Sequence, residues 1–205
     1  MPSVRQSAVV DGNTLTVSCS VGVAMYPDDA VEQDELMRQA DAAMYEAKAA
    51  GRDMARFFSP ETDQRIVARQ TMEAQLRLAL VQDEFTLHYQ PRLNARTRRV
   101  QGAEALLRWN NAALGQVSPA HFIPLAEETG LIKPIGLWVL QQACTQWMAF
   151  RKQGLFEQGE LSVNLSLAQL ADTELVGQLQ QVLNDTGMPP ELLELELTES
   201  HLMDN

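Results

Sequence analysis

Residues 100–109 read V-Q-G-A-E-A-L-L-R-W, and this stretch decides how the second part of the chain is interpreted. It is a short apolar run that holds one acid, Glu104, and one base, Arg108. Strand alternation places Glu104, Leu106 and Arg108 on one face and the residues between them on the other. A carboxylate and a guanidinium on an apolar strand are costly unless they are paired or used. By itself the stretch fits a buried ion pair as well as a functional site.

The composition sets bounds on the class of protein. A chain of 205 residues can hold one large domain or two small ones, and 45% hydrophobic residues suffice for a core. The formal net charge of -11 argues against binding a nucleic-acid polymer, which needs a basic surface, but it allows a single nucleotide in a locally basic pocket. Cys19 and Cys144 lack C-x-x-C spacing, so neither a disulfide framework nor a zinc site is indicated.

The sequence shows no signal for a membrane. The first residues lack an apolar signal core, and no stretch approaches the ~18 consecutive apolar residues of a membrane-spanning helix. We therefore expect a cytoplasmic chain with no membrane contact from this segment.

The first part of the chain has the pattern of a hairpin, a helix and a strand. Residues 8–25 predict a hairpin around Asp11-Gly12-Asn13, because these residues tolerate positive φ at a turn. Residues 34–50 predict a helix with one apolar stripe, ended by Gly51, and residues 56–58 predict a short strand. Ser59 and Pro60 then open a helix that runs to about residue 82 and serves as a stiff joint between domains.

From Glu84 onward strands and helices alternate, which is the pattern of parallel β/α packing. Strands are predicted at residues 85–93, 99–109, 160–167 and 192–199. A short helix ends at Gly130, and longer helices are predicted at residues 134–152 and 168–186. Leu137, Leu140, Gln141, Cys144 and Met148 are the expected buried positions of the second of these helices.

Polar side chains interrupt each predicted strand of this second part, namely Gln90, Glu104 with Arg108, Asn164, and Glu196. Two carboxylates and an amide carbonyl are hard oxygen donors that suit Mg²⁺ or Mn²⁺, and an arginine can hold a phosphate in bidentate fashion. The set therefore indicates metal-dependent phosphoester chemistry. The alternative is structural: Glu194 and Glu196 alternate with leucines as a solvated strand face would, and Asn164 can serve a neighbouring loop.

Residues 1–58 resemble the C-terminal part of a GGDEF (diguanylate cyclase) domain. The resemblance rests on V-S-C-S-V-G-V-A-M-Y-P-D-D and A-D-A-A-M-Y-E-A-K-A-A-G-R-D. It implies a partial ferredoxin-like α+β fold and vestigial phosphate contacts at Lys48 and Arg52, whose i, i+4 spacing would place two cations side by side on a helix end. Cations in a last helical turn are also favourable simply through the helix dipole. The G-G-D-E-F signature itself does not occur, so cyclase activity is not expected.

Residues 73–205 resemble the N-terminal half of an EAL domain, the cyclic di-GMP phosphodiesterase family. The matching motifs are Y-Q-P, E-A-L-L-R-W, F-I-P-L-A-E-E-T-G-L-I, S-V-N-L-S and E-L-T-E-S. The resemblance implies that Glu104, Asn164 and Glu196 are metal ligands for Mg²⁺ or Mn²⁺. It also implies substrate contacts by Gln90 and Arg108, with Arg108 on a phosphate, and a loop-stabilising role for Glu199.

The family's next strand carries D-D-F-G, which does not occur here, and a (β/α)₈ barrel takes ~250 residues. We therefore expect an α/β chain with a GGDEF part at 1–58, a connecting helix at 59–83 and the first half of a TIM-type barrel at 84–205. The expected function is cyclic di-GMP signalling, with a phosphodiesterase as parent and this chain inactive alone. The alternative is a non-catalytic cyclic di-GMP-binding or protein-interaction module. Because the last strand would be an open, leucine-rich edge, we expect a homo-oligomer or a longer parent chain.

Overall fold

The computed structural model describes residues 6–10, 13–156 and 159–197 of the chain. The chain forms two compact units, Met1–Thr71 and Met72–Asn205, whose boundary falls within helix α2 (Pro60–Ala79). Across the described ranges, no helix is both long enough and apolar enough to cross a membrane.

The first unit contains two small sheets. Strands β1 (Gln6–Val10) and β2 (Asn13–Val17) pair antiparallel, while β3 (Val21–Val23) and β4 (Ala55–Phe57) pair parallel. The turn residues Asp11 and Gly12 lie outside the described part of the chain. The prediction of one strand continuing to residue 25 is wrong, because β2 ends at Val17 and the chain then takes a new partner, β4.

Helix α1 (Gln33–Ala49) connects β3 to β4, as a parallel pair of strands requires a crossover. Its predicted apolar stripe is confirmed, since Ala43 and Ala47 are fully buried. The helix packs so closely on β3 that a Cβ atom at Gly22 would lie 1.9 Å from the carbonyl oxygen of Ala40. Only glycine allows this approach of helix and strand.

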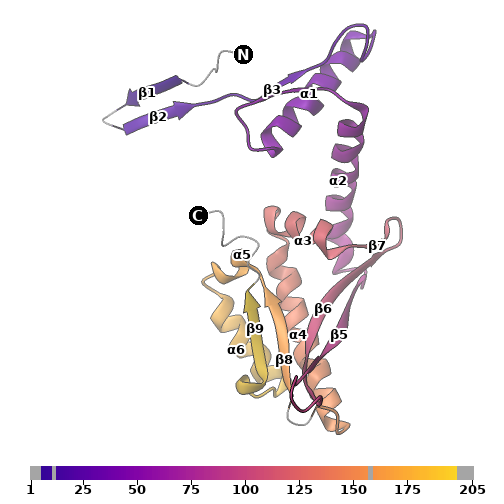
Figure 1. Ribbon diagram of the computed structural model, residues 1–205, viewed down its shortest axis with the longest axis vertical. Helices are drawn as coiled ribbons and strands as arrows, with labels where there is room; N and C mark the ends of the chain where they lie inside the picture. Colours follow the sequence, from indigo (N-terminus) through magenta and orange to yellow (C-terminus); the bar gives the residue numbers. More distant parts are fainter. Residues whose placement is uncertain (1–5, 11–12, 157–158, 198–205) are drawn as a thin grey trace. The chain divides into compact units, whose positions relative to one another are not determined.

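The second unit is built on one sheet with the strand order β5-β6-β8-β9 (Figure 1). Its strands are β5 (Phe85–Leu93), β6 (Val100–Asn111), β8 (Glu160–Leu165) and β9 (Leu193–Leu197), and the short β7 (Gly115–Val117) also pairs with β6. Strands β6, β8 and β9 are parallel, as predicted. Strand β5 is antiparallel to β6, so the prediction of parallel packing is wrong there, because the turn between them is too short for a crossover.

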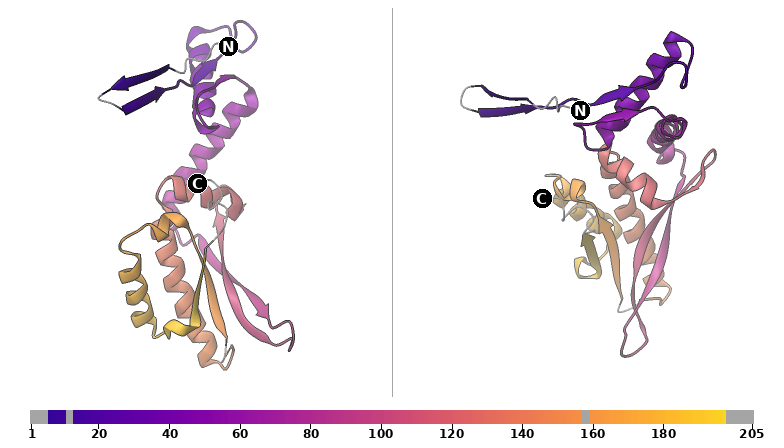
Figure 2. Two further views of the ribbon diagram at one scale, coloured as in Figure 1. Left: turned by 60° about the vertical axis from the view of Figure 1, so that its left-hand side comes forward. Right: turned by 45° about the horizontal axis from the view of Figure 1, so that its top comes forward.

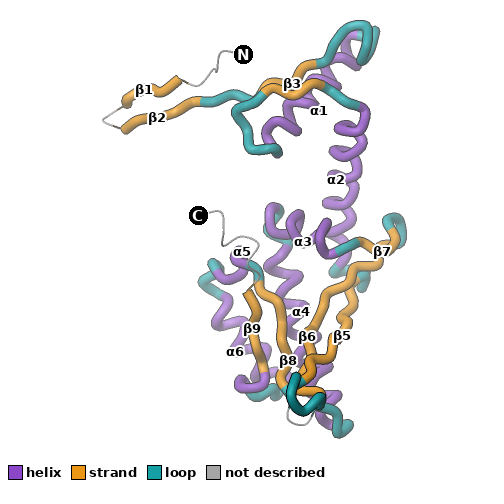
Figure 3. The backbone as a smooth tube through the Cα atoms, viewed as in Figure 1, coloured by secondary structure: helices purple, strands orange, loops and turns teal. Residues whose placement is uncertain are grey.

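Helices cover one face of this sheet (Figures 1 and 2). They are α3 (Pro119–Glu128), α4 (Ile132–Lys152), α5 (Leu167–Leu170) and α6 (Leu175–Thr186), followed by the 3₁₀ turn η1 (Pro190–Leu192). The prediction of one helix over residues 168–186 is wrong, and Figure 3 shows the loop between α5 and α6. In that loop Asp172 accepts a hydrogen bond from the backbone N–H of Glu174 and forms an ion pair with Lys133. Such a side-chain bond to the local backbone favours a turn over a continued helix.

The core of the second unit lies between the sheet and its helices. Trp109, Phe122 and Trp147 are completely buried there, and the Trp109 and Phe122 rings meet edge to face with centroids 5.5 Å apart. Of the expected α4 core, Leu140 and Cys144 are buried, while Gln141 is only half-buried. The odd-numbered side chains of β5, β6 and β8 fill this core, so their even-numbered side chains lie on the opposite face.

Candidate functional site

The face of the sheet opposite the helices, called the open face below, carries most of the polar strand residues. Among the described residues no helix covers it (Figure 2). The residues of this face alternate along each strand with those that fill the core. They are Thr86, His88, Gln90 and Arg92 of β5, Gly102, Glu104, Leu106 and Arg108 of β6, Ser162 and Asn164 of β8, and Glu194 and Glu196 of β9.

The strand register brings the predicted metal ligands to one place on the open face. Asn164 donates a hydrogen bond from Nδ2 to Glu104 Oε1 over 2.5 Å. On the other side, Asn164 is the direct cross-strand partner of Glu196 in the parallel pairing of β8 and β9. Gln90 stands opposite Glu104 in the antiparallel pairing of β5 and β6. One row of polar side chains therefore crosses four neighbouring strands.

The row has the chemistry of a divalent-cation site with few ligands. Two carboxylates and an amide oxygen are hard donors that fit Mg²⁺ or Mn²⁺. Here the Asn164 amide presents its nitrogen to Glu104, and a half-turn of the amide would present Oδ1 instead. Within the described ranges, no group of three or more His, Cys, Asp or Glu side chains could hold a metal ion, and the row itself offers two carboxylates and one amide.

Arg108 lies two pleats beyond Glu104 on β6, where it lines a cavity formed by α3, α4 and the ends of β6 and β8. The cavity has a volume of about 260 Å³, and Asn164 lines it as well. Its walls are mostly apolar and include Ile123, Ile135 and Val139, with Glu127 and Gln169 as polar lining. The Arg108 Nη1 atom donates a 2.8 Å hydrogen bond to the carbonyl of Leu107.

The ion-pair alternative for this strand finds no support in the structure. Glu104 is hydrogen-bonded to Asn164 and Arg108 to a backbone carbonyl, and no ion pair joins Glu104 to Arg108 in the described part of the chain.

Arg92 is a charged residue of the open face that the sequence reasoning missed. Its Nη1 atom donates hydrogen bonds to Ser162 Oγ and to Glu194, and it lies 3.4 Å from Glu196 Oε1. Ser162 Oγ also donates a 2.7 Å hydrogen bond to Glu194. The bond from Arg92, and then that from Ser162, holds the pKa of Glu194 below its ordinary value. Strand alternation could have placed Arg92 on the same face as Gln90, because the two residues are two positions apart on one strand.

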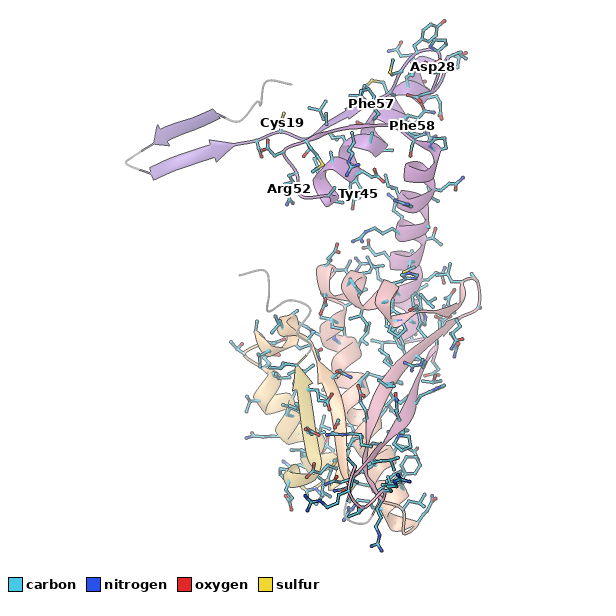
Figure 4. All side chains as sticks on the ribbon, viewed as in Figure 1. Cys19, Asp28, Tyr45, Arg52, Phe57 and Phe58 are labelled. Carbon is cyan, nitrogen blue, oxygen red and sulfur yellow. The ribbon has the colours of Figure 1, made fainter. Side chains whose placement is uncertain are left out.

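The remaining predicted residues lie elsewhere. Glu199 falls outside the described residues. Lys48 is exposed in the last turn of α1, but the helix ends at Ala49, and Arg52 lies beyond it with φ of 62°, in the loop seen in Figure 4. The predicted helical i, i+4 relation between these two cations is therefore wrong, because Gly51, Arg52 and Asp53 all have positive φ and turn the chain away from the helix.

Comparison with known proteins identifies the family. Residues 73–205 match the model of the EAL domain, and residues 2–54 match that of the diguanylate cyclase GGDEF domain. The chain belongs to the EAL domain family, and its first segment corresponds to part of a GGDEF domain.

Several curated proteins and solved structures are similar to this chain. The cyclic di-GMP phosphodiesterase NbdA of Pseudomonas aeruginosa is 37% identical over 100% of this chain, which spans 26% of that protein. The bifunctional diguanylate cyclase/cyclic di-GMP phosphodiesterase MucR of the same organism is 39% identical, covering 98% of this chain and 29% of that protein. Among solved structures, the PaMucR phosphodiesterase in complex with c-di-GMP superposes with a TM-score of 0.61 at 41% identity, covering 66% of this chain and 54% of that chain.

Proposed function

We propose that the open face of the second unit is part of the active site of a cyclic di-GMP phosphodiesterase, which opens the cyclic dinucleotide to linear pGpG. The observation that carries the proposal is the row of Glu104, Asn164 and Glu196 on three neighbouring parallel strands, with Arg108 beside it. The similarity to phosphodiesterases of the EAL family supports the same reaction.

Each residue of the row takes a role that follows from its chemistry. Glu104, Asn164 and Glu196 would hold Mg²⁺ or Mn²⁺, which when bound supplies an acidified water and screens the charge of the phosphodiester. Arg108 would bind a phosphate oxygen pair through its planar guanidinium, and Gln90 would hydrogen-bond the substrate from the adjacent strand. We assign Glu199 to holding a loop near the site, and Lys48 and Arg52 to vestigial phosphate contacts of the GGDEF segment.

A second candidate is a module that binds cyclic di-GMP, or a protein partner, without hydrolysing it. One observation favours it, namely that within the described residues the carboxylates of the row are too few to complete a metal cluster. A site with too few oxygen donors to hold a metal would still present Arg108 and the cavity to a nucleotide.

Binding and turnover measurements on the 205-residue chain separate the two candidates. We expect Mn²⁺ binding, detected by electron paramagnetic resonance, to weaken at least about 10-fold in Glu104→Gln and in Glu196→Gln. Cyclic di-GMP binding, measured by calorimetry, should weaken in Arg108→Ala. Glu191→Gln, at an exposed acid of η1, is the matched control.

Release of pGpG in the presence of Mn²⁺ decides the catalytic part. Turnover that disappears in Glu104→Gln would support the phosphodiesterase for this chain alone. Binding of cyclic di-GMP without turnover would favour the binding module. The absence of both Mn²⁺ and cyclic di-GMP binding would refute the phosphodiesterase and the cyclic di-GMP-binding module.

A further inference from the structure

The side chain of Arg92 crosses the open face next to the proposed metal ligands, at the level of Ser162 and Glu194. Arg92 lies on β5, yet its guanidinium bonds to Ser162 on β8 and to Glu194 on β9, so it passes over the intervening strand β6. The residue of β6 opposite Arg92 in the register is Gly102, which has no side chain to obstruct this path.

The glycine at this position is required by the backbone as well. A Cβ atom at Gly102 would lie 2.2 Å from the carbonyl oxygen of Glu160, so no larger residue fits. Gly102 thus lets β6 and β8 approach closely at the level where Arg92 reaches the far strands.

The charged groups around the Arg92 guanidinium are carboxylates. Glu194 accepts its hydrogen bond, Glu196 Oε1 lies 3.4 Å away, and Glu160 contributes a further negative charge nearby. These contacts raise the pKa of Arg92, chiefly through the bond to Glu194, so the side chain stays cationic. The charge of Arg92 offsets part of the mutual repulsion among these carboxylates.

We propose that Arg92 is the internal counter-ion of the open face and that it competes with a divalent cation for Glu196. This inference rests on the proposed function, because it takes Glu196 as a ligand of the metal site. A cation bound by Glu196 would lie close to the guanidinium, and two like charges at short range weaken each other's binding. Arg92 is in this sense a positioning residue: it bonds to Glu194, lies 3.4 Å from Glu196, and so sets how strongly the face attracts a metal ion.

The direction in which Mn²⁺ affinity changes when Arg92 is replaced separates this role from a merely structural one. In Arg92→Gln the charge is lost while a hydrogen-bonding side chain remains, and we expect the chain to bind Mn²⁺ about 3- to 10-fold more tightly. Arg92→Lys should return the affinity to that of the original chain. If Arg92 only tied the strands together, the Arg92→Gln variant would bind Mn²⁺ more weakly.

Arg77→Gln is the matched control for charge. Arg77 forms an i, i+4 ion pair with Glu73 on α2, and its exposure of 53% resembles the 44% of Arg92. The control removes the same charge away from the open face and should leave Mn²⁺ affinity unchanged. An equal gain in Arg77→Gln, or an unchanged or weaker affinity in Arg92→Gln, would overturn the competition.

A double-mutant cycle in the metal-free chain tests the counter-ion role without any metal. Arg92→Gln and Glu194→Gln should lower the thermal midpoint less together than the sum of their separate effects, by about 1–3 °C for an exposed pair in a chain of this size. Strictly additive effects would overturn the counter-ion role. If no variant binds Mn²⁺ while the cycle is non-additive, the proposed metal site and the competition fail, and the counter-ion role stands.

Discussion

Asn164 and Glu104 are 60 positions apart in the sequence, yet Asn164 Nδ2 donates a 2.5 Å hydrogen bond to Glu104 Oε1. The parallel pairing of β6 with β8 aligns Glu104 with Ser162 and so places Asn164 one pleat further along. The row of proposed ligands therefore depends on strand register as much as on residue identity.

Removing the Asn164 side chain should weaken metal binding without unfolding the chain. Asn164 is exposed, so Asn164→Ala leaves the core intact but deletes one oxygen donor and the partner of Glu104. We expect a loss of Mn²⁺ affinity of about 10-fold, measured by electron paramagnetic resonance. Asn110→Ala, at an exposed asparagine of β6, is the control. Equal affinities in the two variants would exclude Asn164 as a ligand.

Two glycines of the second unit should respond to alanine with opposite signs. A Cβ atom at Gly136 of α4 would lie 1.9 Å from Nε2 of the buried Gln169, whose side chain completes the cap of α5 with Ser166. Gly136→Ala should therefore lower the free energy of unfolding by about 1–3 kcal/mol. Gly177 in α6 has open space around it, so Gly177→Ala should raise that free energy by about 0.5–1 kcal/mol. Urea denaturation monitored by circular dichroism measures both, and a stabilised Gly136→Ala variant would contradict the packing described.

Glu84 should give the chain an acid-sensitive part of its stability. Trp109 Nε1 donates a 2.9 Å hydrogen bond to Glu84, and the buried Asn111 amide donates to both carboxylate oxygens at 3.0 Å. Burial acts to raise the pKa of Glu84, but these hydrogen bonds outweigh it and hold the pKa below its ordinary value.

A lowered carboxyl pKa stabilises the folded chain above the pKa of the unfolded state, near 4.3, and this stability is lost as the pH falls through the folded value. Glu84→Gln should cost about 1 kcal/mol at pH 7, and the difference from the original chain should shrink below about pH 4. Urea denaturation at both pH values measures it, with Glu191→Gln as a control that should stay unchanged. A difference that grows on acidification would contradict the assigned hydrogen bonds.

The two cysteines should differ in reactivity. Cys19 is exposed, whereas Cys144 is completely buried in α4, and burial raises the pKa of its thiol to about 11. Because the thiolate is the reactive species, we expect Ellman's reagent to modify one thiol per folded chain and two in denaturant. In Cys19→Ser the folded chain should show no rapid reaction. Rapid modification of that variant would mean that the core around Cys144 opens readily.

The elements of the second unit were largely predictable from the sequence, and the exceptions have physical reasons. Apolar alternation at 85–93 gave strand β5 with its observed bounds, but alternation is blind to strand direction, so the antiparallel pairing with β6 was missed. At the break between α5 and α6, Asp172 forms an ion pair with Lys133, a residue far away in sequence. A periodicity argument cannot detect such a contact.

The candidate site was predictable where side chain and strand position suffice. Glu104, Asn164 and Glu196 share a face because alternation fixes which side each strand residue occupies. Arg92 was missed because its significance comes from a reach across β6, which depends on the register and on Gly102. The solvated-face alternative for Glu194 was incomplete, since this carboxylate is bonded to Ser162 and Arg92.

The contacts of Glu84 at the open end of β5 and β6 have a consequence for fidelity of folding. By joining the residue just before β5 to Trp109 and Asn111 of β6, they help to fix the register of the whole ladder, including the pairing of Gln90 with Glu104. A slip by a single position would turn Glu104, the acid of β6, inward among the aromatic rings and present Ala103 and Ala105 to the solvent. An indole and an amide at the far end of the two strands thus help to keep Gln90 and Glu104 aligned without contacting either of them.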